Sequence, residues 1–168
     1  MRYFLVVQTG SYQIKRDEVY QEFKNFSIKI NNVEELLKLL KEFAEFYCSI
    51  ALGSEKDKDL GTVFYDIREL RADVCYPLLM EFYHDFKYSL ITKEEFIEAV
   101  LLVESYVFRR VVCDIPTNSQ RQTFATFSKK LNKDKYLESV KATFLLLPSY
   151  RRFPKDEEFI RQLKLKNL

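Results

Sequence analysis

Residues 92–116 read TKEEFIEAVLLVESYVFRRVVCDIP, and this stretch decides the fold that we expect. Thr92 and Glu95 have the spacing of a capping box, in which the two side chains satisfy the first free backbone amides of a helix. The residues that follow carry apolar side chains at helical spacing, and Pro116 prevents the helix from continuing. We therefore predict a long central helix that ends near Cys113 and has other helices around most of its surface.

The composition points to helices throughout the chain. Of 168 residues, 47% are hydrophobic, and only three are glycine and four are proline. All-β folds need more turn residues than this, and disordered chains are less apolar. We predict an all-α fold, a multi-helix bundle of about eight helices with no substantial sheet. The expected segments are the end of an element at 1–10 and helices near 15–26, 33–52, 60–72, 74–88, 93–113, 119–131, 132–147 and 155–165.

The helix expected after Asn32 has the clearest pattern. Asn32 is a favoured N-cap residue, and Glu34 and Glu35 lie in the first turn, where the helix dipole favours negative charge. Gly53 marks the expected end of this helix. Its apolar side chains should share the face that packs against the bundle. That face comprises Val33, Leu36, Leu37, Leu40, Phe43, Ala44, Tyr47 and Ala51.

The length is typical of one helical domain, which we place at 1–168. Two polar connections, near 54–59 and 114–119, are the positions at which this domain would divide, if it divides at all. The first ten residues begin abruptly with an apolar run and close at Gly10, as if they finished an element. We expect the chain to be a fragment of a longer protein.

No residue pattern in this chain carries a known catalytic or cofactor chemistry. Cys48, Cys75 and Cys113 are widely spaced and odd in number, which favours reduced core cysteines over disulfides or a zinc site. His84 is the single histidine, so the chain holds no HExxH motif, and three scattered glycines cannot form a phosphate-binding loop. We predict no catalytic, cofactor-binding or metal-binding residues.

The apolar runs are short. The longest, such as 100–103 and 144–147, fall far below the roughly 20 residues that a membrane-spanning helix needs, and no secretory signal is visible. We expect a cytoplasmic protein without membrane contact.

The central helix carries one acid and two arginines that look like a site. A projection at about 100° per residue places Glu104 in the middle of an apolar arc, Arg110 at its flank and Arg109 on a narrow polar strip. A buried carboxylate needs a partner, so we predict a structural ion pair that involves Glu104 and Arg110. A catalytic role for a perturbed Glu104 is the less favoured reading. Other candidate partners of Glu104 are backbone groups near the Pro116 turn and three further arginines, Arg68, Arg71 and Arg121.

Charge is distributed unevenly along the chain. Residues 1–108 have a net charge of −6 and residues 109–168 a net charge of +8. This asymmetry is typical of a nucleic-acid surface, and equally of two parts of one protein that attract each other. The basic side chains in the second part also fit a solvated face over an aromatic core. The candidate nucleic-acid contacts are Arg109, Arg121, Lys129, Lys130, Arg151 and Arg152.

Two segments resemble one protein family. The run Glu104–Ser119 (ESYVFRRVVCDIPTNS) and the segment Arg152–Phe159 (RFPKDEEF) are similar to the GmrSD-type, modification-dependent (type IV) restriction proteins, also called domain of unknown function 262. Flanking pieces, including 17–24 (DEVYQEFK), look like the opening of that family's helical region. The resemblance extends over essentially the whole chain. The Asp-Gly-Gln-Gln-Arg stretch of the family's nucleotide site is absent, so no catalytic residue is carried over.

The resemblance implies a function by position in a longer protein. Family members place a ParB-like nucleotide-hydrolysing domain before this region and often a His-Asn-His-type nuclease domain after it. The chain would then be a non-catalytic helical link in a phage-defence restriction endonuclease driven by nucleotide hydrolysis, with those two domains as partners and DNA as a further one. The alternatives are a helical nucleic-acid-binding module that uses 109–168 and a homodimerisation unit.

Overall fold

The computed structural model of the protein describes residues 1–30 and 32–166, and within them it contains nine α-helices, four short 3-10 helices and no strand. The predicted all-α fold is confirmed. The α-helices are α1 (Arg2–Thr9), α2 (Val19–Ser27), α3 (Val33–Leu52), α4 (Lys58–Glu69), α5 (Tyr76–Lys87), α6 (Lys93–Val112), α7 (Gln120–Ala125), α8 (Tyr136–Leu145) and α9 (Asp156–Leu165). The 3-10 helices are η1 (Asp73–Cys75), η2 (Ser128–Lys130), η3 (Lys133–Lys135) and η4 (Ser149–Arg151).

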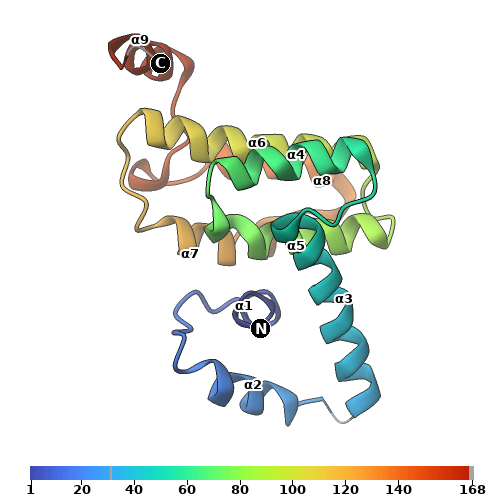
Figure 1. Ribbon diagram of the computed structural model, residues 1–168. Helices are drawn as coiled ribbons and strands as arrows, with labels where there is room; N and C mark the ends of the chain where they lie inside the picture. The colour runs from blue at the N-terminus through green and yellow to red at the C-terminus, as the bar shows by residue number, and fades with distance from the viewer. Residues whose placement is uncertain (31, 167–168) are drawn as a thin grey trace.

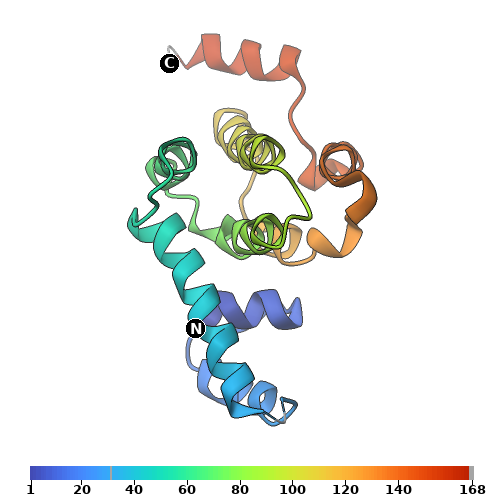
Figure 2. The same ribbon diagram turned by 90° about the vertical axis from the view of Figure 1, so that its right-hand side faces the viewer.

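The helices form a bundle with two outlying parts. Helices α4 and α6 lie side by side above α5 and α7, and α8 closes the bundle behind them (Figure 1). Helix α3 leaves this bundle and runs down to α2, while α1 lies between α2 and α5. Helix α9 lies outside the bundle, above α6 (Figure 2). None of the helices in the described part of the chain is both long and apolar enough to cross a membrane.

Local capping signals set the helix ends as expected. The Asn32 side-chain oxygen accepts hydrogen bonds from the amides of Glu34 and Glu35 at 2.9 and 3.3 Å. At the start of α6, the Glu95 amide donates to the Thr92 hydroxyl at 3.2 Å and the Thr92 amide donates to the Glu95 carboxylate at 2.8 Å. Helix α1 ends at Gly10, whose φ of 66° is left-handed. These caps fix where the long helices begin and end.

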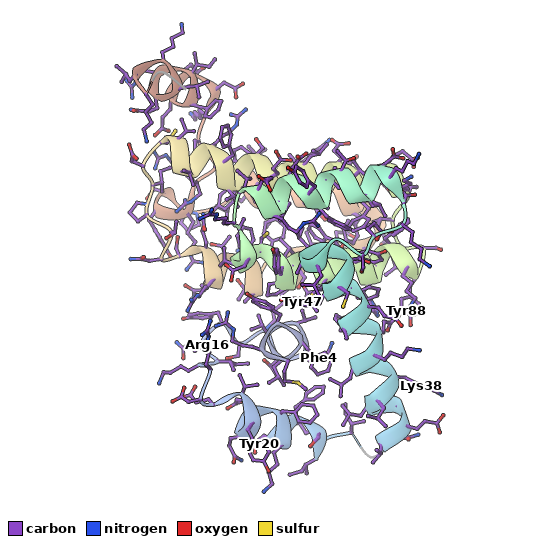
Figure 3. The ribbon with its side chains drawn as sticks, in the orientation of Figure 1. Phe4, Arg16, Tyr20, Lys38, Tyr47 and Tyr88 are labelled. Atoms are coloured by element: carbon purple, nitrogen blue, oxygen red, sulfur yellow. The ribbon has the colours of Figure 1, made fainter. Side chains whose placement is uncertain are left out.

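The predicted packed face of α3 is partly wrong. Val33 and Leu37 were expected inside and are 70% and 60% exposed. The reason lies in the position of the helix, because its first turns extend past α5 and away from the bundle (Figure 1). Figure 3 shows Lys38 on the outer side of this extension and Tyr20 on the outer side of α2. The buried residues of α3 are Leu36, Phe43, Phe46 and Ile50.

The predicted helix near 119–131 is also wrong in length. It is a six-residue α7 followed by η2, and the next predicted helix begins with η3 before α8. The interruption occurs at Thr126, whose amide donates to the Thr123 carbonyl at 3.4 Å while its hydroxyl donates to the Gln122 carbonyl at 2.8 Å. Such side-chain bonds compete with the helical backbone pattern and bend or end short helices.

One hydrophobic core connects the bundle. It extends from Phe4 to Leu147 and includes residues on both sides of the connections 54–59 and 114–119. Aromatic rings dominate it, because stacked and edge-to-face pairs bury large areas. The pairs include Phe46 with Tyr83, Phe86 with Phe96, Tyr106 with Phe144, and Phe127 with Phe144.

The capping box at the start of α6 gives a stability prediction. Thr92→Ala removes the side-chain acceptor for the Glu95 amide, so we expect the free energy of unfolding to fall by about 1 kcal/mol. Chemical denaturation followed by circular dichroism measures it. Thr62→Ala, on the exposed face of α4, is the matched control and should change stability by less than about 0.5 kcal/mol. Equal losses in the two variants would show that the box contributes nothing.

Candidate functional site

Arg110 is the best-enclosed charged side chain in the protein. It is fully buried, and its guanidinium donates to the carbonyl oxygens of Pro116, Tyr150 and Arg152 at 2.6, 3.4 and 3.3 Å. The same group lies over the Tyr106 ring, 5.2 Å from its centroid. Arg110 therefore joins three parts of the chain: the end of α6, the turn after it, and the segment around η4.

No carboxylate pairs with Arg110 among the described residues, so backbone dipoles carry its charge. Burial lowers the pKa of Arg110 from its usual value, and the neighbouring Tyr106 acts in the opposite direction. An arginine nevertheless keeps its proton in a protein, because its ordinary pKa is above 12. A fork of donors with fixed geometry suits several carbonyls better than a lysine ammonium does. The arrangement is a cationic staple between backbone segments.

Tyr106 reinforces the staple one turn earlier on α6. Its hydroxyl donates to the Arg151 carbonyl at 2.9 Å, and its ring contacts Phe124, Phe144 and Phe153. Burial raises the pKa of Tyr106, so the hydroxyl stays protonated as a donor. An aromatic residue and an arginine at i and i+4 on an apolar arc were the sequence signal for this cluster, and the sequence analysis used only the arginine.

Arg109 performs the corresponding task on the other side of α6. Its guanidinium donates to the Ser105 hydroxyl at 3.1 Å and to the Pro154 carbonyl at 3.2 Å, and it forms an ion pair with Asp156. It also lies over the Phe159 ring, 5.0 Å from the centroid. Arg109 is thus one of the side chains that attach α9 to the bundle.

The two segments that carry the family resemblance therefore meet in space. Residues 109–110 belong to the first segment, and residues 152–156 belong to the second, about forty positions later. Backbone carbonyls, aromatic rings and one carboxylate of the second segment receive the two arginines of the first. We call this contact region the arginine junction. It contains no nucleophile beside a base and no pair of acids, so it is suited to holding chain segments together.

The predicted ion pair of Glu104 with Arg110 is wrong. Arg110 binds carbonyls instead, and Glu104 forms no ion pair with any residue in the described part of the chain. Glu104 is half-buried between α6 and α4, where burial and then the nearby Asp66 carboxylate raise its pKa. The projection put Glu104 at the centre of the apolar arc, but α4 covers that arc incompletely, so water still reaches the carboxylate. Arg68, one alternative partner, donates to the Ile50 carbonyl at 2.8 Å.

The six candidate nucleic-acid contacts divide into two groups. Arg109, Arg151 and Arg152 are engaged with Asp156, Gln122 and Glu158. The other group is exposed and forms no ion pair within the described residues; it consists of Arg121, Lys129 and Lys130. Of these, Lys129 extends over Gly10, where any larger side chain would collide with it. The structure thus leaves about half of the predicted basic surface open to a partner.

A second polar cluster, missed by the sequence analysis, joins α5 to the segment after α7. Asp85 is buried and accepts from the Tyr136 hydroxyl at 2.6 Å, and Lys133 forms an ion pair with the same carboxylate. Burial raises the pKa of Tyr136. Burial also raises the pKa of Glu81, which lies one turn before Asp85 on α5, to about 7. A hydrogen bond with Ser128 opposes the shift of Glu81, and the Asp85 charge adds to it. Only an acid at i and i+4 hinted at this cluster.

The side chains that bind metals are scattered. Among residues 1–30 and 32–166 no group of three or more His, Cys, Asp and Glu residues could hold a metal ion. His84 stacks on Phe43 at 5.7 Å between ring centroids and contacts Tyr88, as a packing residue does. All three cysteines are free thiols, and burial raises the pKa of Cys75 and of Cys113.

The resemblance to the restriction proteins is supported only by the sequence segments quoted above. No family model, no curated protein and no solved structure matches this chain.

The arginine junction gives a second stability prediction. Arg110→Met keeps the apolar stem but removes the donors to three buried carbonyls, so we expect a loss of about 2–4 kcal/mol in the free energy of unfolding. Arg110→Lys should recover only part of this loss, since one ammonium cannot reproduce the fork. Arg161→Met, at an exposed position on α9, is the control and should be nearly neutral. Urea unfolding of the four proteins decides between these outcomes.

Glu81 gives a pH prediction. Its folded-state pKa of about 7 lies above the ordinary 4.5, so the folded protein holds this proton more tightly than the unfolded chain does. The contribution to stability is complete below about pH 4.5 and is lost as the pH rises to about 7. Glu81→Gln should therefore gain about 1–2 kcal/mol relative to the parent between pH 5 and pH 8. Thermal melts across this range test it, with the exposed Glu138→Gln as a variant that should show no such trend.

Proposed function

We propose that this chain is a non-catalytic helical region of a phage-defence, modification-dependent restriction protein of the GmrSD type. In this proposal it lies between a nucleotide-hydrolysing domain and a nuclease domain of a longer cytoplasmic protein and transmits the state of one to the other. The proposal begins from the resemblance of 104–119 and 152–159 to that family.

The observation that carries the proposal is the arginine junction. The two segments that most resemble the family are the same two segments that hold α6 to the C-terminal part of the chain through Arg109 and Arg110. Residues with a structural task of this kind are constrained in any protein that needs the same arrangement. The alternative reading of the arginine pair, as a catalytic or phosphate-binding site, is less well supported because both guanidinium groups are already engaged.

The geometry also suits a region that transmits motion. The core of the bundle is continuous and rich in aromatic residues, so its middle moves as one body. Helix α9 is attached through Arg109, Arg152 and ring contacts such as Phe108 with Phe159, at 5.8 Å between centroids. A rigid body with one surface-attached helix is able to couple two neighbours by changing how that helix sits.

A second candidate function is nucleic-acid binding by 109–168. It is favoured by the exposed side chains of Arg121, Lys129 and Lys130, which have no ion-pair partner among the described residues. Homodimerisation is the third candidate, and the exposed Leu145 and Leu146 at the end of α8, 81% and 82% accessible, favour it.

Binding and turnover assays on the purified chain separate these candidates. For the leading proposal we expect no nucleotide hydrolysis and no DNA cleavage above the buffer blank; either activity would contradict it. For nucleic-acid binding, electrophoretic titration of modified and plain duplexes over a salt series should show a steep slope that falls by about 3 when Arg121, Lys129 and Lys130 are all changed to Glu.

The matched control for this titration reverses charge elsewhere. Lys38→Glu with Lys41→Glu alters two exposed lysines of α3, and Figure 3 shows Lys38 on the part of α3 that extends away from the bundle. If both sets of changes weaken binding equally per reversed charge, the duplex is responding to net charge alone and the specific surface is ruled out. A mass that rises with concentration in light scattering would favour the dimer.

A further inference from the structure

A cleft of about 540 Å³ lies beside the arginine junction and is not part of it. Its walls come from the end of α4 and η1 on one side and from the last turns of α6 and the start of α7 on the other, at the left of the bundle in Figure 1. The residues that define its chemistry are Arg71, Asp73, Val107, Val111, Gln120 and Arg121. This volume is within the range of small-molecule sites, roughly 300–1,000 Å³.

Gln120 is the unusual member of this wall. Its side chain is 97% enclosed, given a residual exposure of 3%, yet its amide nitrogen has no hydrogen-bond partner among the described residues. Buried side-chain amides in proteins are nearly always paired, because an unpaired donor loses its hydration without compensation. Because this nitrogen has almost no accessible surface, a ligand oxygen in the cleft would supply the missing acceptor once the amide turns toward the cleft. The residue is therefore placed as a recognition group.

Two arginines from different elements flank the cleft. Arg71 follows α4 and Arg121 lies in the first turn of α7, and neither forms an ion pair within the described residues. Arg71 has a left-handed φ of 51°, a conformation that favours glycine, so an arginine is held at this position at a cost in backbone strain. Both side chains are exposed and available to an anion.

The cleft has one acid, and its charge is partly compensated. The Asp73 carboxylate accepts a hydrogen bond from the Tyr3 hydroxyl at 2.7 Å. An adjoining hollow shares Asp73, Val74 and Arg121 with the cleft and adds Arg2. Three arginines against one aspartate leave this side of the molecule positive, so an anion is favoured over a cation.

The remaining wall is apolar. Val107 and Val111 stand one turn apart on α6, and Leu70 and Val74 face the same space from the other side. Val111 is 56% exposed, which is unusual for a valine on an otherwise buried helix. A flat or apolar part of a ligand would cover these side chains and remove them from water.

We propose that this cleft binds a small organic phosphate. Its phosphate would lie between the Arg71 and Arg121 guanidinium groups, one of its oxygens would accept from the Gln120 amide, and its apolar part would pack on Val107 and Val111. A phosphate fits better than a carboxylate, because two guanidinium forks on separate elements offer more donors than the two oxygens of a carboxylate can use. This proposal does not rest on the proposed function, since none of these residues belongs to the arginine junction.

In the described part of the chain, a neighbouring hollow around Cys113–Ser119 lacks the free guanidinium groups that the cleft has. That hollow holds about 420 Å³ and is lined by Asn118, Tyr150 and Arg152. Its arginine, however, forms an ion pair with Glu158. Only the cleft combines unpaired guanidinium groups, among the described residues, with a buried and unpaired amide.

The test uses phenyl phosphate as the probe and NMR as the readout. In ¹H–¹⁵N spectra of the whole chain, the Gln120 side-chain amide reports binding at the proposed position. We expect saturable shifts of this signal with a dissociation constant between about 10 µM and 1 mM. Arg71→Gln and Arg121→Gln should each weaken binding at least about tenfold. Arg16→Gln and Arg161→Gln, at exposed positions outside the cleft, should leave it unchanged.

Competing probes decide which chemistry the cleft recognises. Inorganic phosphate should bind more weakly than phenyl phosphate, and benzoate more weakly still. If no shift appears with phenyl phosphate up to about 10 mM, or if the arginine variants bind as the parent does, the proposal is overturned. It is also overturned if benzoate binds as well as phenyl phosphate, or if a short DNA duplex displaces the probe at lower concentration than adenosine monophosphate does.

A further variant, whose folding is checked separately, distinguishes a loss of binding from a loss of folding. Gln120→Glu retains the size of the side chain and places a carboxylate against the bound phosphate, so it should abolish binding while circular dichroism shows a folded protein. If this variant binds phenyl phosphate as the parent does, the assigned position is wrong.

Discussion

The guanidinium of Arg110 is the interaction on which the rest of the structure depends. It is a charge without a carboxylate partner among the described residues, stabilised by carbonyl dipoles that approach from the turn after α6 and from η4. A buried charge of this kind is tolerated only when the geometry around it is fixed, because any loosening exposes its desolvation cost. Three chain segments must therefore be correctly placed at this one position, and the aromatic rings of Tyr106 and Phe153 pack around it.

The parts of this fold that the sequence could predict are the local ones. Asn32 and the pair of Thr92 with Glu95 set helix starts through contacts within four residues, and both are where the pattern placed them. The break after α7 was missed because at Thr126 the hydroxyl, and not the amide, donates to the Gln122 carbonyl. The inner face of α3 was predicted wrongly because burial depends on which helices pack against it, and the sequence of one helix does not show which helices these are.

The candidate site shows the same division. The sequence identified Arg109 and Arg110 as the informative pair and predicted an internal role for Arg110, but the predicted partner of Arg110, Glu104, is not its partner. The acceptors of Arg110 are main-chain carbonyls, which every residue has, so no residue type in the sequence indicates them. Gln120 was not singled out, since an unpaired amide is visible only when its surroundings are known. Lys129 and Lys130 look alike in sequence, and only the structure shows that one extends over Gly10.

Helix α9 has no buried residue, and side chains on α6, around η4 and at Asp114 attach it to the rest of the protein. Its hydrogen-bonded backbone can therefore separate from the bundle without opening the aromatic core, which makes it a local unfolding unit of its own. Under a pulling force applied at the C-terminal end, the ion pair of Lys166 with Asp114 would break first and the contacts of Arg109 and Arg152 next, and the core would bear load only afterwards. Helix α9 would thus separate under load before the aromatic core beside it unfolds.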